Sequence, residues 1–391
     1  MYLPLELPPL SLYVHLPWCV RKCPYCDFNS HPSGGGPVPE DRYVDALLDD
    51  LAQEVADAAG RELISVFIGG GTPSLFRPES VARLLGGIAA RIPLAPNAEI
   101  TLEANPGAAE RERFAGYREA GVNRLSVGVQ SFDDDLLRSI GRIHDGRQAR
   151  LALEVGATAG FSRINVDLMY GLPGQTPAQA LADIRLACRL AAGHISHYQL
   201  TLEPGTPFHH RPPALPDSDN TWRMQRECGQ ALAGAGFLHY ETSAWARPGE
   251  ECRHNLNYWR FGDYLGIGAG AHAKLTTPGR NAVVRRWKQR GPKAYMGAAA
   301  GSARIGGEIP VAPADRALEY LMNALRLAGG ADLSALERRT GVAAASLSRP
   351  IGTAVHRGLA IREDNLLRPT ERGRRFLDDL LLLFLPETAD A

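Results

Sequence analysis

The sequence predicts an α/β protein in which a partial or full β/α barrel precedes a small, winged-helix-like α+β domain. Two observations predict the barrel. Short apolar, β-branched runs recur about every 25–45 residues, and segments with helical periodicity separate them. Strands that alternate with helices form βαβ units with parallel strands and right-handed crossovers. A third observation, helical stripes followed by a hairpin pattern near the C-terminus, predicts the second domain.

The elements of the barrel follow one another in chain order. The six predicted strands are residues 11–16, 63–68, 98–104, 123–129, 163–169 and 195–201. Tyr43, Leu47, Leu51 and Val55 repeat at i, i+4, which is the stripe of an amphipathic helix, and residues 178–192 have a similar pattern. These units fit a barrel over about residues 11–210, and a doubly wound open sheet is the structural alternative.

The loops after these strands are polar and rich in glycine and proline. Parallel α/β folds carry their chemistry at the carboxyl ends of strands, so we expect one composite site there. The loops hold, in chain order, a cysteine cluster at 19–26, GGGTP at 69–73, EANPG at 103–107, QSF at 130–132, Asp167 with YGLPG at 170–174, and EPG at 203–205.

The second domain is expected to begin near the loop-like stretch 301–314. We therefore predict two domains, residues 1–300 and residues 301–391. In the second, a helical stripe runs from Leu318 to Leu325, two shorter helical segments and a hairpin at 359–368 follow, and a last helix starts near Thr370.

Composition excludes several classes of protein. The chain has 391 residues, 45% of them apolar, and 43 Lys and Arg balance 43 Asp and Glu. Disorder as the main state is excluded, and no net charge draws the whole chain to nucleic acid or anionic lipid. The longest apolar run, 380–385, is too short to cross a bilayer. Residues 1–10 lack the features of a signal peptide, so we expect a cytoplasmic protein.

Three of the six cysteines, Cys19, Cys23 and Cys26, lie within eight residues of one another. In a reducing compartment, such clusters hold metal more often than they form disulfides. A cubic iron–sulfur cluster held by three thiolates keeps one iron open for a ligand. A zinc site that adds His31 is the alternative. The glycine loop and Tyr25 favour the iron–sulfur cluster.

The motif CVRKCPYC resembles the CxxxCxxC signature of the radical S-adenosylmethionine (SAM) superfamily. YVHLPWCVRKCPYCDFNSH, GGGTPSLF, LEANPG, RLSVGVQSF, NVDLMYGLPGQT and LRPTERGRRFL resemble the branch that contains oxygen-independent coproporphyrinogen III dehydrogenase and the haem chaperones. The resemblance covers nearly the whole chain. It implies a [4Fe–4S] cluster on Cys19, Cys23 and Cys26, whose open iron chelates the amino and carboxylate groups of SAM.

The resemblance also implies which residues contact SAM. The matching positions are Tyr13, Gly70, Gly71, Thr72, Glu103, Gln130, Arg142 and Asp167, with Thr201 and His272 at less regular ones. Carboxylates at strand ends can accept hydrogen bonds from an amino group or from ribose hydroxyls. A guanidinium such as that of Arg142 can pair with the SAM carboxylate.

Two departures separate this chain from the dehydrogenases. Their pattern has a fourth cysteine two residues after the third, where this chain has Phe28, and only eighteen residues precede Cys19. Residues 254–258 form the pattern HNxxY, which is associated with haem binding in the haem chaperones. The side chains of His254 and Tyr258 can both ligate haem iron. Arg253 is a candidate partner for a haem propionate. We therefore expect haem at His254 and Tyr258 and no coproporphyrinogen dehydrogenase activity, with the dehydrogenase as the alternative function. Whether SAM is turned over stays open.

Partners follow from the resemblance alone, which implies delivery of haem to respiratory haem proteins; peripheral contact with a membrane is left open. The basic runs 285–288 and 372–375 are expected to form solvated surface. The last helix mixes Arg with Glu371, Asp378 and Asp379, which is not a basic recognition face, so we expect no nucleic-acid binding.

Overall fold

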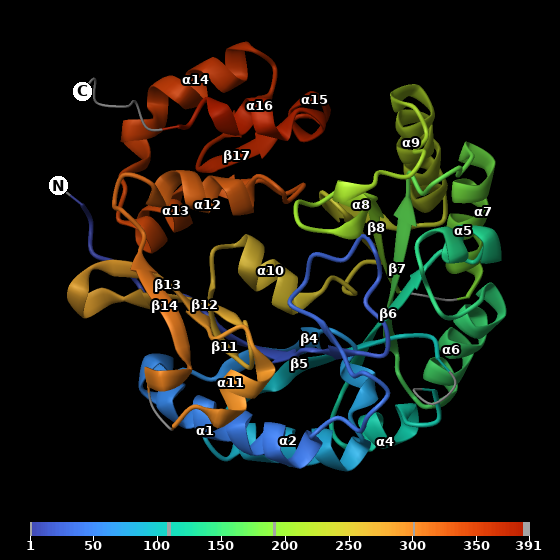
Figure 1. The fold of residues 1–391 in the computed structure, drawn as a ribbon. Coiled ribbons are helices and arrows are strands. Elements are labelled where there is room, and N and C mark those ends of the chain that lie inside the picture. The colour runs from blue at the N-terminus through green and yellow to red at the C-terminus, as the bar shows by residue number, and fades with distance from the viewer. Residues whose placement is uncertain (1, 108–110, 191–192, 300–301, 386–391) are drawn as a thin grey trace.

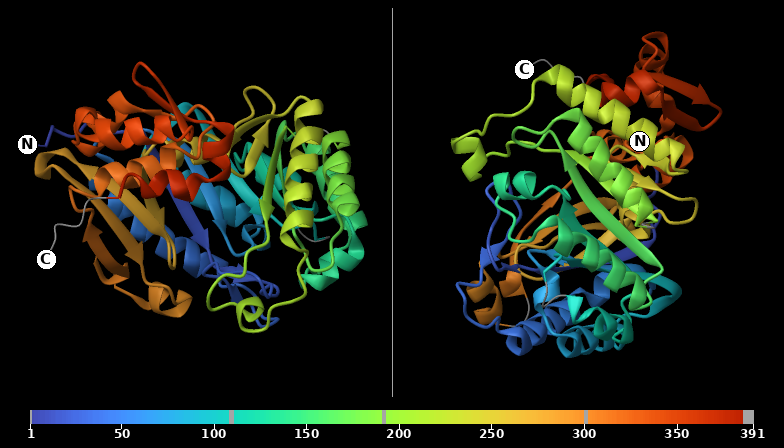
Figure 2. Two further views of the ribbon diagram at one scale, coloured as in Figure 1. Left: turned by 90° about the horizontal axis from the view of Figure 1, so that it is seen from above. Right: turned by 90° about the vertical axis from the view of Figure 1, so that its right-hand side faces the viewer.

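A computed structural model describes residues 2–107, 111–190, 193–299 and 302–385. Its centre is a curved sheet of twelve strands in the order β14-β13-β12-β11-β1-β4-β5-β6-β7-β8-β10-β9. Helices cover the outer side of the sheet, and a smaller C-terminal body packs over one end (Figures 1 and 2).

Seven neighbouring strands of this sheet are parallel. They are β11 (Asp263–Ile267), β1 (Leu10–Leu16), β4 (Leu63–Gly70), β5 (Leu94–Ala104), β6 (Arg124–Gln130), β7 (Arg163–Tyr170) and β8 (His194–Gln199). All six predicted strands are confirmed. From β1 to β8 the spatial order follows the chain order, whereas a doubly wound sheet reverses direction. Within the described residues β8 does not pair with β11, so the barrel is partial.

Antiparallel strands extend both ends of the parallel sheet. They are β12 (His272–Thr277), β13 (Ala282–Lys288) and β14 (Ile305–Pro310) beyond β11, and β10 (Ala244–Ala246) and β9 (Leu238–Glu241) beyond β8. A short pair, β2 (Trp18–Cys19) and β3 (His31–Pro32), brackets the cysteine loop.

Alternate residues of the parallel strands have opposite environments, as the period of two in a strand requires. Apolar residues such as Leu102 and Val127 belong to the main hydrophobic core. The residues between them are polar and bond across strands: Ser65 to Ser11, and Asn165 to Ser126. The inner side of the partial barrel therefore carries polar side chains, together with the Phe67 ring beside His254.

The outer helices bury one face each. In α1 (Glu40–Ala58), Tyr43, Leu47 and Leu51 are fully buried, which confirms the predicted stripe up to Leu51, whereas its last residue, Val55, is exposed. The helix predicted at 178–192 is α7 (Pro177–Arg189), and residues 191–192 lie outside the described part of the chain. The other outer helices are α2 (Pro78–Ala89), α4 (Phe114–Glu119), α5 (Asp134–Ser139), α6 (Gly146–Thr158), α9 (Ser218–Gly234) and α11 (Pro292–Gly297). Two further helices are the short α8 (Pro207–His210), which buries no residue, and α10 (Arg253–Trp259), which lies inside the curve of the sheet (Figure 1).

The C-terminal body is built around a second hydrophobic core, which includes Leu321 and Leu336 and which Phe261 and Val283 of the barrel part join. Its elements are α12 (Arg316–Ala324), β15 (Ala331–Asp332), α13 (Leu333–Thr340), α14 (Ser348–His356), β16 (Ala360–Glu363), β17 (Leu366–Pro369), α15 (Glu371–Arg375) and α16 (Leu377–Leu382). The predicted hairpin is β16–β17. The predicted domain boundary between residues 300 and 301 lies outside the described residues and stays a prediction.

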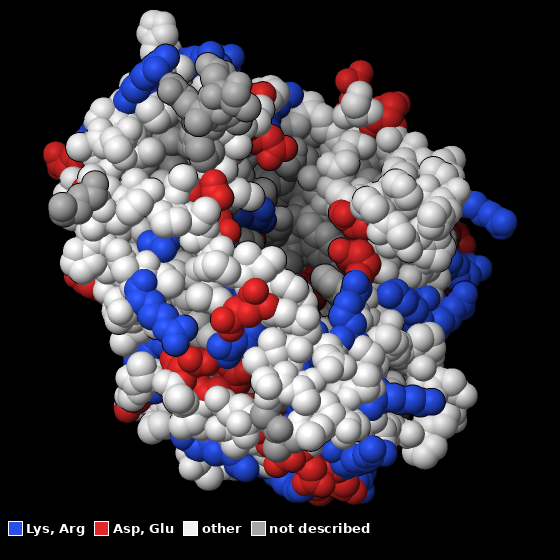
Figure 3. Space-filling model, turned by 60° about the vertical axis from the view of Figure 1, so that its left-hand side comes forward, with Lys and Arg blue, Asp and Glu red and all other residues white. Residues whose placement is uncertain are grey.

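The basic run 285–288 is not the solvated surface that the sequence suggests. Arg285 pairs with Glu319 at 2.6 Å, Arg286 pairs with Glu54 and Asp57 at 2.7 Å, and Lys288 is buried against Asp50 at 2.6 Å. Figure 3 shows acidic and basic side chains interspersed over one face of the molecule. The described helices include none that is long and apolar enough to span a membrane.

Candidate functional site

Two adjoining cavities open at the carboxyl ends of the parallel strands. The three clustered cysteines line the first, which we call the cysteine cavity. The second, of about 780 Å³, reaches His254 and Tyr258, and we call it the histidine cavity. Phe28, Gly70 and Glu103 line both, so the two cavities share a wall.

The cysteine loop follows β1, as predicted. Burial raises the pKa of the Cys19 and Cys26 thiols, and hydrogen bonds from Thr72 to Cys19 and from Ser30 to Cys26 partly offset it. Metal binding requires thiolates, so loading a metal here would release protons.

The donor set fits an iron–sulfur cluster better than a zinc ion. Mononuclear zinc needs its ligands to converge on one point. Among the described residues, no three His, Cys, Asp or Glu side chains are grouped that closely, and His31 does not line the cysteine cavity. In a cubic cluster each thiolate binds a different iron, so three thiols spread around one cavity are compatible with it.

The glycine loop lines the cysteine cavity, and close packing against neighbouring segments also requires glycine at two of its positions. Gly70 has φ +120°, and a Cβ there would lie 2.7 Å from the His15 ring. A Cβ on Gly71 would lie 2.5 Å from the Trp18 carbonyl oxygen, beside the cysteine loop. The glycines therefore let the two loops approach each other.

Glu103 and Asp167 come together at the end of the sheet. Burial and the nearby Asp167 raise the pKa of Glu103 to about 7. Burial likewise raises the pKa of Asp167, and hydrogen bonds from Asn165, Ser196 and Ser126 partly offset this rise. The backbone N–H of Gly70 donates to Glu103 at 3.0 Å. Burial disfavours the ionised form of both carboxyl groups. A cationic ligand stabilises that form, so the pair is well placed to bind one.

Arg142 and Gln130 also line the cysteine cavity. The Arg142 guanidinium donates to Asn105 Oδ1 at 2.7 Å and to the Gly128 carbonyl, and it lies 3.8 Å from Cys23 Sγ. Its buried Nε has no partner among the described residues. Gln130 has φ +68°, rare for a residue with a side chain, and accepts from Tyr198 at 2.8 Å.

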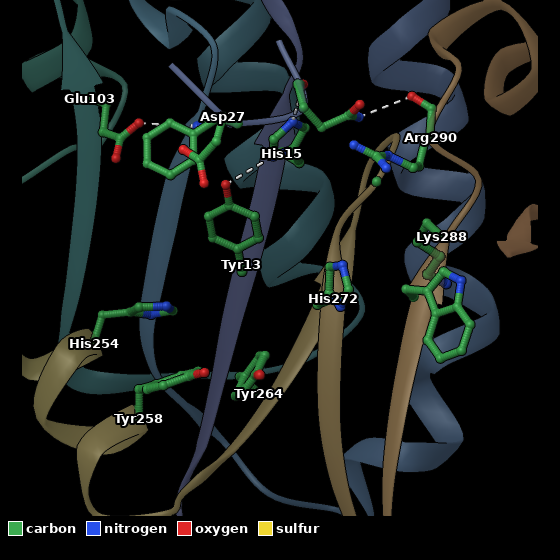
Figure 4. Close-up of a pocket in the computed structure, with 15 residues that line it drawn as sticks. Tyr13, His15, Asp27, Glu103, His254, Tyr258, Tyr264, His272, Lys288 and Arg290 are labelled. Atoms are coloured by element: carbon green, nitrogen blue, oxygen red, sulfur yellow. Dashed lines mark hydrogen bonds between the residues drawn. The ribbon is translucent and has the colours of Figure 1, made fainter. Parts of the chain in front are cut away.

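Three of the residues expected to contact SAM do not line the cysteine cavity, and the first of them, Tyr13, lines the histidine cavity instead. Its hydroxyl lies 2.9 Å from His15 Nδ1. His272 also lines the histidine cavity, whereas Thr201 lines neither cavity and instead donates to Glu203. Figure 4 shows His254 and Tyr258 on one side of the histidine cavity and His272 on the other.

The His254 imidazole is held in one tautomer. Its Nδ1 lies 3.0 Å from the Ser65 hydroxyl, which donates to Ser11 at 2.8 Å. The Ser65 oxygen therefore accepts from His254 Nδ1–H, which leaves a lone pair on Nε2. No hydrogen bond from a described residue reaches Nε2. Burial lowers the pKa of His254 to about 4, so the ring is neutral near pH 7.

Residues that the sequence analysis did not select hold α10 in place. Glu99 Oε1 accepts from the backbone N–H of Arg253 at 2.9 Å and of His254 at 3.3 Å. Its Oε2 pairs with Arg124 and Arg163. The signal available in the sequence was Glu99 itself, a charged residue early in the apolar strand that ends near Glu103. Arg253 itself donates to the Asn97 carbonyl and does not line the histidine cavity, so the expected role on a haem propionate is not supported.

Comparison with family models gives two matches. Residues 13–187 match the radical SAM superfamily, and residues 311–376 match the HemN C-terminal domain. The solved structure of coproporphyrinogen III oxidase (HemN) from Escherichia coli, described as a radical SAM enzyme, superposes with a TM-score of 0.82. It covers 97% of this chain and 90% of that one at 23% identity, a level that establishes the fold alone.

Curated relatives match over the full length. The heme chaperone HemW of Escherichia coli K12 is 48% identical, with 98% of this chain and 100% of the relative covered. That of Haemophilus influenzae is 47% identical over 98% and 99%. That of Mycobacterium tuberculosis is 37% identical over 76% and 78%. With the cysteine cavity at the strand ends and both domain matches in order, this chain belongs to the heme chaperone HemW family of the radical SAM superfamily.

Proposed function

We propose that this protein is a haem chaperone: it carries a [4Fe–4S] cluster and SAM in the cysteine cavity, binds haem in the histidine cavity, and passes haem to a recipient protein. The observation that carries the proposal is His254, a neutral imidazole whose Nε2 lone pair is free inside a cavity that adjoins the three cysteines. The full-length relatives named heme chaperone HemW support it.

Cys19, Cys23 and Cys26 are the proposed cluster ligands. A cluster held by three thiolates supplies an open iron that can bind the amino and carboxylate groups of SAM. The hydroxyls of Thr72 and Ser30 lie beside the sulfurs and stabilise their thiolate forms. The aromatic ring of Tyr25 also lines the cavity.

The remaining polar residues of the cysteine cavity are the proposed contacts of SAM. Glu103 and Asp167 offer carboxylates to a ligand that carries positive charge on its sulfonium and ammonium groups. Arg142 Nε–H has no partner within the described residues, and that donor suits a carboxylate. Gly70, Gly71, Thr72 and Gln130 complete the proposed set, and Tyr13 would reach SAM only from the adjoining histidine cavity.

Haem is proposed to enter the histidine cavity with its iron toward His254. Ligating histidines usually donate the other ring N–H to a fixed acceptor, and Ser65 is such an acceptor here. The cavity is within the 300–1,000 Å³ range of small-molecule sites, and Tyr258, Tyr264 and Trp287 provide aromatic walls. Tyr258 is the second proposed ligand, one helical turn after His254.

The alternative function, decarboxylation of coproporphyrinogen III, has no observation of its own in its favour. The solved coproporphyrinogen III oxidase shares the fold at 23% identity. Phe28, at the position of the fourth cysteine of that enzyme class, is 63% exposed and lines both cavities. Delivery to respiratory haem proteins is part of the proposal and rests on resemblance alone.

The test starts from protein purified and reconstituted with iron and sulfide under anaerobic conditions. A Soret titration with haemin measures binding, transfer to an apo-haem protein such as apomyoglobin measures delivery, and a decarboxylation assay measures the alternative. We expect saturable binding, transfer that is faster than from free haemin, and no conversion of coproporphyrinogen III. Conversion to protoporphyrinogen IX without a saturable Soret change would overturn the proposal.

A further inference from the structure

The histidine cavity is lined by two basic side chains of very different character, Lys288 and Arg290. Lys288 is 1% exposed, and Asp50 and Glu54 neutralise its charge. Among the described residues, none forms an ion pair or a hydrogen bond with the Arg290 guanidinium. Arg290 is therefore the cation of this cavity that is free to take an anionic ligand.

The backbone of Arg290 is fixed although its guanidinium is free. The Asn29 side chain donates to the Arg290 carbonyl at 3.0 Å and to the Ala269 carbonyl at 2.9 Å. The next residue back, Gln289, donates through its backbone N–H to the Arg304 carbonyl at 2.9 Å. The anchored backbone fixes the point from which the exposed Arg290 side chain reaches the cavity, so the ordering required on binding is confined to the side chain.

The charges of the cavity are separated in space. Figure 4 shows Glu103 and Asp27 together on one side of the opening and Arg290 on the other. An anionic group is repelled from the first side and attracted to the second. The proposed iron ligand His254 lies apart from both groups in this view, and it is buried whereas Arg290 is exposed.

We propose that Arg290 binds the propionate carboxylates of haem and thereby sets the orientation of the macrocycle, with the iron toward His254. This inference rests on the proposed haem site and deepens it. A planar guanidinium pairs with carboxylates through two parallel N–H···O bonds, which fixes direction as well as adding affinity. Arg290 takes the role that the sequence suggested for Arg253, whose side chain lies outside the cavity.

The test compares two ligands on the reconstituted full-length protein: haemin, and haemin dimethyl ester, in which both propionates are uncharged. We expect Arg290→Gln to weaken haemin about tenfold, as the loss of a charge-assisted hydrogen bond predicts, and to leave the ester unchanged. Arg290→Lys should recover part of the haemin affinity. Arg280→Gln is the matched control, because Arg280 lies at the far end of the β12–β13 hairpin, outside the cavity, and should affect neither ligand.

Equal weakening of both ligands by Arg290→Gln, or of neither, would overturn the role of Arg290. Iron content and SAM affinity, measured on the same samples, exclude misfolding as the cause. Failure of the proposed haem site gives a different result. In that case the wild-type protein either binds neither haemin nor the ester, or binds them equally well after His254→Ala.

Discussion

The imidazole of His254 on α10 and the hydroxyl of Ser65 on β4 are joined by a 3.0 Å hydrogen bond across 189 residues of chain. The bond joins the helix to the inner side of the sheet, and the Ser65 hydroxyl in turn donates to the Ser11 hydroxyl on β1. It fixes both the direction of the ring and the nitrogen that carries the proton. The proposed iron ligand is thus oriented by two other elements of the fold.

Ser65→Ala is expected to weaken haem binding about tenfold, the lower end of the effect of removing a hydrogen-bond partner from a ligating histidine. The imidazole loses the one acceptor that the described part of the chain offers to Nδ1–H, and it can adopt the other tautomer. A haemin titration measures the change, and Ser346→Ala, at an exposed site in the C-terminal body, serves as the control. Wild-type affinity in Ser65→Ala would show that the bond does not orient a ligand.

Haem affinity should stay nearly constant between about pH 8 and about pH 5.5. Burial lowers the pKa of His254 from 6.5 to about 4, so protons do not compete with iron over this range. Unfolded chain takes up the proton below its ordinary pKa, so His254 lowers the stability of the apo-protein as the pH falls from 6.5 toward 4. Haemin titrations at several pH values test this. A loss of affinity centred near pH 6.5 would contradict a buried, neutral ligand.

Single replacement of Cys19, Cys23 or Cys26 by alanine should abolish the brown absorbance and the bound iron, because each thiolate holds a different iron of the cluster. Cys188→Ala is the control, since Cys188 lies on α7 and lines neither cavity. Iron analysis and visible spectra after anaerobic reconstitution measure the effect. Stoichiometric zinc without iron in the wild-type protein would instead support the mononuclear site.

SAM affinity should rise with pH across neutrality. Burial and the nearby Asp167 raise the pKa of Glu103 from 4.5 to about 7. Between these values the folded protein binds more protons than the unfolded chain, so Glu103 makes the apo-protein less stable as the pH rises through this range. A cationic ligand pairs with the ionised carboxyl, so binding tightens as Glu103 loses its proton.

Equilibrium binding of SAM at about pH 6 and about pH 8 tests this expectation. Glu103→Gln should remove the pH dependence, and Asp167→Asn should move it to lower pH, because the neighbouring negative charge is gone. Asp217→Asn, at the N-terminus of α9, is the control. Affinity that is the same at both pH values in the wild type would exclude Glu103 as a contact of the cation.

The sequence predicted those parts of the molecule that depend on local patterns. Strand β7 is apolar and flanked by turn residues, so its position and Asp167 near its end could be expected. The cysteine cavity follows from the rule that loops after parallel strands share one rim. Contacts between distant segments could not be expected. The pairing of Lys288 with Asp50, the bond from Ser65 to His254 and the position of Tyr13 in the histidine cavity all depend on the curvature of the sheet.

Glu99 links the sheet to the start of α10. Its carboxylate, 2% exposed, accepts two backbone N–H groups of α10 through Oε1 and pairs with two arginines through Oε2. Backbone N–H groups at the start of a helix have no partner within the helix, so the carboxylate satisfies them. Because His254 is one of the two residues held, Glu99 should act on haem binding without touching haem.

Glu99→Gln is therefore expected to lower haem affinity by about tenfold while SAM affinity and iron content stay at wild-type levels. Glutamine keeps one acceptor but loses the charge that Arg124 and Arg163 require, so the N-terminus of α10 is held less firmly. The matched control is Glu250→Gln, which removes a carboxylate that pairs with Arg163 at 3.6 Å and that, among the described residues, forms no side-chain hydrogen bond to α10. A thermal unfolding curve for each variant shows whether the fold is intact. If the two variants reduced haem affinity equally, the effect would come from the arginines and not from the position of α10.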